Sequence, residues 1–335
     1  MLALAAAALT AQQVPRFGER VEVARVIVDV RVIDDRGDPI RGLSPEDFKV
    51  RIDGRLCRVE TATWVGGSDS ADPPPALGSP AALPPVHAEN AARLIVFVFQ
   101  KDLERSRIVG LMPMLLKTRD FLGTLAPRDR VAVLSFDSHL KIWTDFTRDR
   151  ARLERLLGHD VLLKSPQGVQ ASEPPSLLER LTADGARRAY SIERALERIG
   201  EALEPLPGSK ALVLVGHGFG RLSASGMSME PDYDPARRAL VAARTSVFSL
   251  DVTDADYHSL EAGLQIVAEQ TGGFYQRTHV FSDLAMRRLA GVLAGYYVLF
   301  VEKPETGRRA HDIEVELTRG KGVVHATSSY AAESR

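Results

Sequence analysis

The chain has 335 residues, 44% of them hydrophobic, and a formal net charge of -1. This length suits roughly two domains of ~150 residues, with enough apolar residues to bury a core. The near-neutral charge gives no reason to expect nucleic acid or an anionic membrane as a partner. A single cysteine, Cys57, excludes an intrachain disulfide and a cluster of thiolate metal ligands.

Residues 1–17 contain a run of small apolar side chains. Residues 1–11 read MLALAAAALTA, and polar Gln12 follows. The run is too short for a transmembrane helix and resembles the apolar core and cleavage region of a secretory signal, although no basic region precedes it. We interpret it as a possible signal segment, with a simple apolar tail as the alternative, and expect an exported protein, periplasmic or extracellular. No other stretch approaches ~18 uninterrupted apolar residues, so no transmembrane segment is expected.

Residues 18–65 are predicted to form a small β module. Valine occupies every second position from 26 to 32, which is the period-two pattern of a strand with one buried face. Asp53 and Gly54 stand between two short alternating runs and predict a tight hairpin. Residues 66–92 are rich in Pro, Gly, Ala and Ser and show no periodicity, so we interpret them as an extended linker.

From residue 93 to residue 295, apolar strands alternate with helices. This is the pattern of a doubly wound, Rossmann-like α/β domain with a parallel sheet. The predicted strands cover residues 94–99, 130–136, 138–144, 210–215, 245–250 and 274–275. The predicted helices cover residues 105–125, 190–204, 259–270 and 282–294.

The tail, residues 296–332, returns to β structure. Alternating or apolar runs predict strands over 296–301, 312–317 and 323–326. Two-stranded pieces are marginal in isolation. We therefore expect these strands to pack with residues 18–65 into one β-sandwich, with the α/β domain inserted between its two halves.

Four local motifs, taken in order and spacing, resemble the acidobacterial-type von Willebrand factor A-related family. They are residues 42–48 (GLSPEDF), 128–133 (RDRVAV), 269–273 (EQTGG) and 296–299 (YYVL). The resemblance covers residues 21–330, nearly the whole chain. It implies an exported protein that binds other proteins through a von Willebrand A-like domain.

In the wider family, such a domain holds Mg²⁺ in a metal-ion-dependent adhesion site at the carboxyl edge of the sheet. The resemblance implies an Asp-x-Ser-x-Ser pattern on the first loop, yet this chain begins there with Gln100 and offers only Asp102-x-Glu104-x-Ser106, two residues further on. The second loop has Tyr190 where a Thr is expected, and His217 occupies the third loop in place of Thr-Asp-Gly. We expect a degenerate site without Mg²⁺ or another resident cofactor.

Two alternatives remain for the polar residues of these loops. Asp102, Glu104, Ser106 and His217 are candidate ligands of a rearranged site, because His beside carboxylates suits Zn²⁺ or Mn²⁺ better than Mg²⁺. In the other interpretation, Asp102 and Glu104 cap the following helix, where negative charge is favourable, and His217 is an ordinary loop residue.

Other candidate sites give weaker signals. The sequence Gly-His-Gly-Phe-Gly at 216–220 imitates a nucleophile elbow, but its central residue, Gly218, has no side chain to attack with. Residues 251–257 form an acidic stretch after a strand and lack the Gly and the distal Glu of a calcium loop. Capping of the helix over 259–270 by Asp256 or Ser259 explains this stretch better.

These observations predict a non-enzymatic, exported interaction module with a protein partner and no nucleic acid. The expected partner-binding edge comprises Gln100, Asp102, Glu104, Tyr190, His217, Phe219 and Arg221. Two alternatives belong to other classes: a metal-dependent hydrolase or other enzyme that uses Asp102, Glu104 and His217, and a structural scaffold in the cell envelope. The identity of the partner and the oligomeric state are left open.

Overall fold

The computed structural model describes residues 25–66, 93–102, 104–224, 226–303 and 310–331. The predicted signal segment and nearly all of the predicted linker lie outside these described residues. Within the described part of the chain, no helix combines the length and the apolar character that a bilayer crossing requires.

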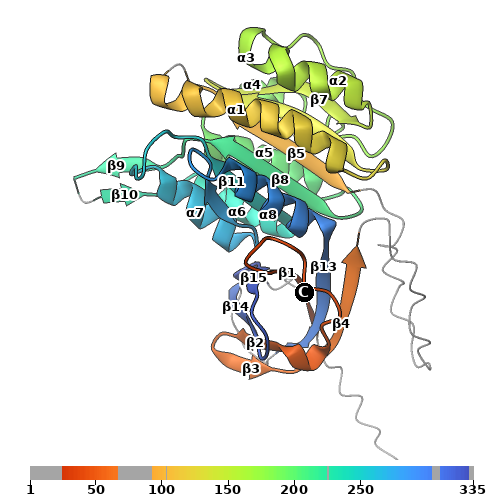
Figure 1. The fold of residues 1–335 in the computed structure, drawn as a ribbon. Helices are drawn as coiled ribbons and strands as arrows, with labels where there is room; N and C mark the ends of the chain where they lie inside the picture. Colours follow the sequence, from red (N-terminus) through yellow and green to blue (C-terminus); the bar gives the residue numbers. More distant parts are fainter. Residues whose placement is uncertain (1–24, 67–92, 103, 225, 304–309, 332–335) are drawn as a thin grey trace, which may run out of the picture.

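A six-stranded sheet forms the centre of the larger part of the molecule (Figure 1). Its strand order is β12-β11-β8-β5-β6-β7, with β7 antiparallel to β6 and the other neighbouring pairs parallel. The strands are β5 (Leu94–Gln100), β6 (Arg130–Phe136), β7 (Leu140–Thr147), β8 (Lys210–Gly216), β11 (Thr245–Asp251) and β12 (Tyr275–Arg277). The predicted mixed α/β class with a parallel-containing sheet is confirmed.

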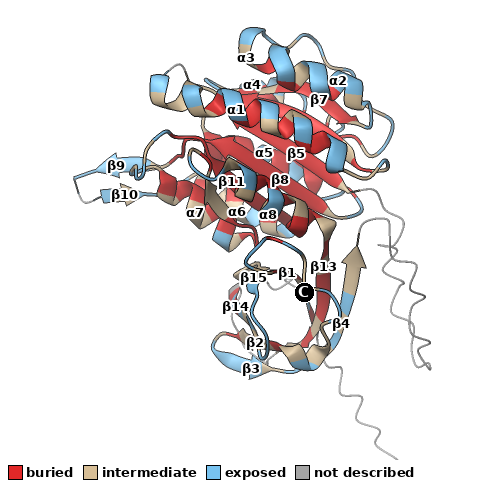
Figure 2. Ribbon diagram, viewed as in Figure 1, coloured by how far each residue is buried: buried red, intermediate tan, exposed pale blue. Residues whose placement is uncertain are grey.

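Helices cover both faces of this sheet, because successive side chains of a strand point to opposite sides. In β5, Val96 and Val98 enter one core with α5, α6 and α7, whereas Phe97 and Phe99 enter a second core with α1 and α8. These helices are α1 (Arg105–Phe121), α5 (Ile192–Leu203), α6 (Tyr233–Ala242), α7 (Glu261–Gln270) and α8 (Ser282–Ala294). Figure 2 shows the buried sheet between helices whose outer sides are exposed.

Short elements fill the connections. They are the 3-10 turns η1 (Pro45–Asp47) and η2 (Leu122–Thr124), the π turn η3 (Leu156–Asp160), the helices α2 (Arg150–Arg155), α3 (Val161–Leu163) and α4 (Ala183–Arg187), and the hairpin of β9 (Arg221–Ser223) and β10 (Gly226–Ser228). This hairpin extends from the molecule beside α7 (Figure 1).

Strands from the two ends of the chain pair with one another in the smaller part of the molecule. One sheet has the order β15-β1-β13-β4, and another has the order β16-β14-β2-β3. The strands are β1 (Arg25–Ile33), β2 (Phe48–Ile52), β3 (Arg55–Cys57), β4 (Val59–Gly66), β13 (Gly295–Glu302), β14 (Ala310–Leu317), β15 (Val323–Ala326) and β16 (Ser329–Ala331). The alternating valines of β1 are buried in a core to which both sheets contribute.

The opposite face of β1 is buried at its carboxyl end, at Arg31 and Ile33, which its polar residues did not indicate. Arg31 is 4% exposed, and its Nη1 donates a hydrogen bond to Oγ of Ser246 in β11 at 2.7 Å. Its guanidinium lies 5.6 Å from the ring centre of Phe248 and 5.1 Å from that of Tyr296. A cation between two aromatic faces is attracted to both, so Arg31 holds the β strands against the α/β part.

Several element boundaries differ from the expected ones for local reasons. The predicted helix over 105–125 ends at Phe121, where a 3-10 turn continues it. α5 begins at Ile192 because the Ser191 hydroxyl accepts a hydrogen bond from the Arg194 N–H. α7 begins at Glu261, and its N-cap is Leu260 without a side-chain hydrogen bond, so the expected capping by Asp256 or Ser259 is wrong.

Gly110 of α1 sets the distance between this helix and the end of β11. A Cβ at position 110 would clash with the main-chain oxygen of Val252. We predict that Gly110→Ala lowers the free energy of unfolding by about 1–3 kcal/mol, because main-chain atoms cannot move aside cheaply. Gly123→Ala is the matched control, since a Cβ there meets nothing within 4 Å. Urea unfolding measures both, and equal stabilities of the two variants would contradict this prediction.

Candidate functional site

Three neighbouring parallel strands, β5, β8 and β11, end together at one edge of the sheet. Their last residues are Gln100, Gly216 and Asp251, and Gly216 is paired with Asp251 in the register of β8 and β11. Open α/β sheets bind ligands at the carboxyl ends of their strands. The predicted site residues of the first and third loops therefore lie at the expected edge.

The side chain of Gln100 bridges the end of β5 and the loop after β8. Its Nε2 donates to the carbonyl oxygen of Gly218 at 2.8 Å, and its Oε1 accepts from the N–H of His217 at 3.1 Å. A carboxylate has no N–H or O–H to donate, so it could not make both bonds. Gly216 is required beside this bridge, because a Cβ at that position would clash with Oε1 of Gln100.

His217 lies inside the edge, not on an open loop. It is 7% exposed, its Nε2 lies 3.8 Å from Oδ2 of Asp102, and its Nδ1 has no hydrogen-bond partner among the described residues. Burial, followed by the positive charge of Arg107, lowers the pKa of His217 to about 4. The imidazole is therefore neutral at physiological pH.

Asp102, Glu104 and Ser106 form a tight turn before α1. Oδ1 of Asp102 accepts from the Glu104 N–H at 2.9 Å, and Oε1 of Glu104 accepts from the Ser106 hydroxyl at 2.8 Å. Both carboxylates also pair with Arg107. Glu104 occupies the N-cap position of α1, but its side chain makes no capping hydrogen bond. The structure thus brings Asp102 toward His217, while Glu104 and Ser106 bond within their own turn.

Besides Glu104, the exposed part of the edge includes an aromatic ring and two Arg–carboxylate pairs. Tyr190 is 67% exposed, and the Arg194 guanidinium lies 6.0 Å from its ring centre. Arg194 makes two bonds to Asp232, at 2.9 and 3.0 Å. Arg221 makes two bonds to Glu230, at 2.8 and 2.9 Å. Such bidentate pairs hold the guanidinium groups in defined orientations.

Three of the predicted edge residues are buried. Gln100, His217 and Phe219 are buried, with exposures of 7%, 7% and 5%. Phe219 packs toward the ring of Tyr233, with ring centres 6.4 Å apart. Because these three side chains are enclosed, they can influence a partner only through the loops that they support.

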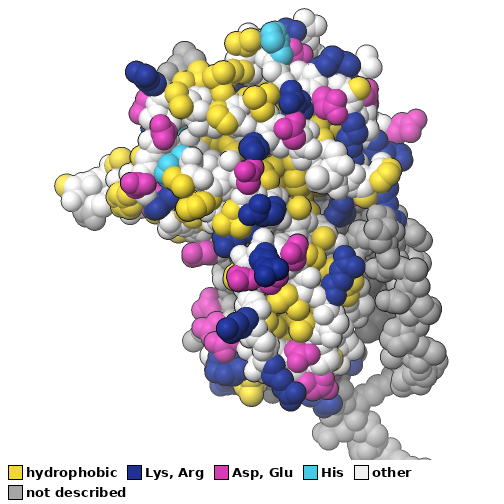
Figure 3. All heavy atoms as spheres, viewed as in Figure 1, with side chains coloured by type: hydrophobic (Ala, Val, Ile, Leu, Met, Phe, Trp, Pro, Cys, Tyr) yellow, Lys and Arg dark blue, Asp and Glu magenta, His cyan; other side chains and the backbone are white. Residues whose placement is uncertain are grey.

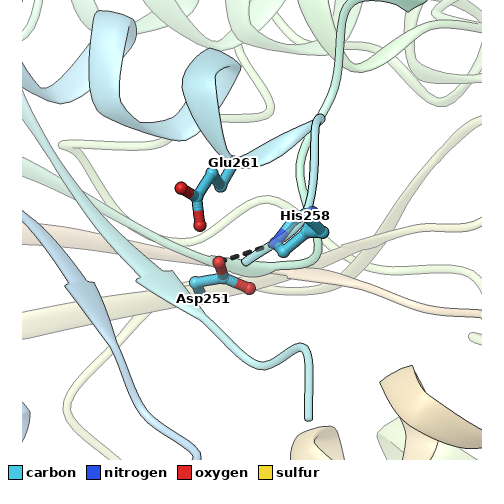
Figure 4. A group of neighbouring side chains, drawn as sticks. All are labelled: Asp251, His258 and Glu261. Atoms are coloured by element: carbon cyan, nitrogen blue, oxygen red, sulfur yellow. Dashed lines mark hydrogen bonds and ion pairs between the residues drawn. The ribbon is translucent and has the colours of Figure 1, made fainter. Parts of the chain in front are cut away.

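A second group of ionisable side chains, which we did not predict as a site, lies at the end of β11. Asp251, His258 and Glu261 converge from the strand end, the following loop and the first residue of α7 (Figure 4). We expected Asp251 in an acidic loop, but it is the last residue of β11 and is 1% exposed. The His-x-x-Glu spacing at the start of a helix was the available signal.

Hydrogen bonds connect this second group closely. Nε2 of His258 lies 2.8 Å from Oδ2 of Asp251, and the Tyr275 hydroxyl donates to the same oxygen at 2.8 Å. Tyr275 also lies 3.2 Å from Oε2 of Glu261, which pairs with Arg277. Burial and the neighbouring Asp251 raise the pKa of Tyr275, so its phenol stays protonated.

No family model and no curated protein matches this chain. Among solved structures it is similar to the human COPII-coat protein Sec24c, with 11% identity, a TM-score of 0.41 and coverage of 71% of this chain and 44% of that chain. A von Willebrand factor type A protein from Catenulispora acidiphila has 9% identity, a TM-score of 0.43 and coverage of 91% and 72%. The manganese-loaded TRAP protein of Plasmodium vivax has 8% identity, a TM-score of 0.41 and coverage of 71% and 93%.

The chain thus spans less than half of the length of the Sec24c chain. TM-scores of 0.43 or lower at these identities support no inference about binding or catalysis. The parallel sheet of this chain is established by its own strand order and register.

The buried imidazole of His217 predicts a loss of stability in acid. The unfolded chain binds a proton at His217 below pH 6.5, whereas the folded chain binds it only below about pH 4. The free energy of unfolding therefore decreases as the pH falls through this window, and His217 contributes on the order of 2–3 kcal/mol to this decrease. Burial lowers the pKa of His325 to about 4 as well, so His325 adds to the loss of stability in acid.

His217→Gln should remove the contribution of His217 and flatten the pH dependence, while exposed His159→Gln should leave it unchanged. Urea unfolding at about pH 7 and about pH 4.5 measures the difference. A slope that is the same in all three proteins would show that His217 is not buried in its neutral form.

Proposed function

We propose that this chain is an exported, non-enzymatic protein-interaction module, in which the carboxyl edge of the sheet binds a protein partner without a metal ion. In this proposal residues 93–295 form a von Willebrand A-like domain, inserted in a β-sandwich of residues 18–65 and 296–332. Residues 1–17 act as the signal segment, and residues 66–92 as a linker. The periplasm or the extracellular space is the proposed location.

The observation that supports this proposal most is the bridge made by Gln100. A Mg²⁺ site at this edge requires carboxylate or hydroxyl oxygens in near-octahedral geometry. The carboxamide of Gln100 is engaged by the main chain of residues 217 and 218, and that loop offers an imidazole and two glycines in place of oxygen ligands. The residues present do not fit Mg²⁺, so we infer that metal-dependent capture has been lost. The bridge holds together the loops that a metal would otherwise connect.

The exposed residues of the edge suit a protein partner. Tyr190 and Arg221 are residue types that often contribute most of the binding energy in interfaces, because they bury a large area with few rotatable bonds or form several hydrogen bonds. Acidic and basic side chains are interspersed over the face drawn in Figure 3, in keeping with the net charge of -1. We therefore propose that the partner is a protein and not nucleic acid.

Affinity capture from the envelope of the native host, with the full chain as bait, tests this proposal. The captured protein is identified, and its Kd is measured with and without EDTA. We predict that the double substitution Tyr190→Ser with Arg221→Ser weakens binding about tenfold or more, since truncation of central aromatic and Arg residues commonly costs about 2 kcal/mol or more. EDTA should leave binding unchanged.

The control is Arg55→Ser with Leu56→Ser, which removes one Arg and one large apolar side chain from exposed positions of β3. It should bind as the unmodified chain does. Equal losses in both double variants would remove the edge from the proposal, and loss of binding in EDTA would contradict metal independence. Binding that neither double variant alters would favour the scaffold alternative.

A further inference from the structure

The group at the end of β11 has the composition of a transition-metal site. Asp251, His258 and Glu261 each offer one ligand atom, and these atoms all lie within 4.8 Å of one another. Asp251 is 1% exposed and Glu261 is 5% exposed, while the side chain of His258 is 18% exposed. Buried carboxylates are costly unless a proton, a cation or hydrogen-bond donors compensate them. Here the Thr253 N–H and Tyr275 supply donors to Asp251, and Arg277 pairs with Glu261, so the group combines two compensated carboxylates with an imidazole.

The hydrogen bonds within the group are compatible with a metal. Nε2 of His258 and Oδ2 of Asp251 lie 2.8 Å apart and share one proton, which a bound metal would replace. Tyr275 donates to Oδ2 of Asp251 and lies 3.2 Å from Oε2 of Glu261, and Arg277 donates to both oxygens of Glu261. Partners of this kind orient metal ligands in proteins and hold their lone pairs in place.

Independent support comes from two buried polar side chains next to Asp251. Thr253 donates its main-chain N–H to Oδ1 of Asp251 at 2.9 Å, and His217 follows Gly216, the register partner of Asp251. Thr253 is 8% exposed, and its Oγ1 has no hydrogen-bond partner among the described residues. His217 is 7% exposed, and the same holds for its Nδ1. A buried polar atom without a partner is destabilising, so these two atoms have capacity for a further hydrogen bond beside the end of β11.

We propose that Asp251, His258 and Glu261 form a binding site for a divalent transition metal. One imidazole and two carboxylates match Zn²⁺ better than the hard cations Mg²⁺ and Ca²⁺, which take oxygen ligands. Three protein ligands leave a fourth position for water or for a group of a partner molecule. This site differs from the rearranged one considered at Asp102, Glu104 and His217, and it does not rest on the proposed function.

A pocket lies beside this part of the edge. Its volume is about 300 Å³, and Tyr275 and Arg277, which contact the two carboxylates, are among its lining residues. The other lining residues are Asp256, Gln276, His279, Val280 and Phe281. Exposed Phe281 and Val280 make part of its wall apolar, and the three proposed ligands are not among its lining residues.

Metal titration of the full chain tests the proposal. The purified protein is treated with EDTA, dialysed and titrated with ZnCl₂ by calorimetry, and with CoCl₂ by visible absorption, which reports the coordination of Co²⁺. We expect one Zn²⁺ per chain. His258→Gln should weaken binding by more than roughly 100-fold, since even the loss of a residue that only orients a ligand costs about 10–100-fold.

Two control variants separate this site from its neighbours. Asp102→Asn tests the rearranged site at α1, and His159→Gln removes an exposed imidazole that pairs with Asp160. Both should bind Zn²⁺ as the unmodified chain does. Absence of stoichiometric binding by the folded chain would overturn the proposal, as would unchanged binding in His258→Gln or loss of binding in either control.

A measurement on the unmodified chain keeps the proposal testable if His258→Gln fails to fold. Zn²⁺ bound to His258 should protect its ring from carbethoxylation by diethylpyrocarbonate, and mass spectrometry of the peptide that contains residue 258 reads this directly. Labelling of His159 in the same sample is the internal control. Equal labelling of His258 with and without Zn²⁺ would overturn the proposal whatever the variants do.

Discussion

One side chain, Gln100, determines the geometry of the carboxyl edge. Parallel strands end with main-chain groups that have no partner in the sheet, and these groups must be satisfied from outside it. Gln100 supplies a donor to Gly218 and an acceptor to the N–H of His217, so the loop after β8 is tied to the end of β5. A Cβ at Gly218 would clash with Leu260, the residue before α7, so the same loop also limits where α7 begins.

This constraint divides the edge into two parts of different chemistry. Around Asp102, the carboxylates are paired with Arg107, and His217 is enclosed and neutral. Around Asp251, two buried carboxylates face an imidazole, and donors hold them from the side. The proposed loss of a metal site at β5 and the proposed metal site at β11 are compatible, because the ligands belong to different strand ends.

Much of the fold was predictable because burial leaves a periodic pattern in the sequence. The period-two valines of β1 and the apolar run of β5 indicated their strands, and α8 begins and ends as predicted. The position of a site residue was predictable only where the residue lies at or next to the end of a predicted strand. Gln100 and His217 were expected at the carboxyl edge for this reason, and they lie there. Their burial was not expected, because it depends on contacts between residues 117 positions apart. Asp251, His258 and Glu261 were missed, since residues 252–260 between strand and helix follow no regular period.

The sequence by itself determined the alternation of strands and helices, the two-sided burial of the sheet and the residues at its carboxyl edge. Those features follow from local periodicity and from the position at which each strand stops. Only the tertiary structure decided that Arg31 faces an aromatic interior, that the Gln100 carboxamide bridges two strand ends, and that His258 meets Asp251. The order of the strands brings together the groups of the first two contacts, whereas the third joins the end of β11 to the loop that follows it. The physical reason is that a polar side chain is compatible with water or with a buried partner, and its own sequence neighbourhood does not distinguish the two.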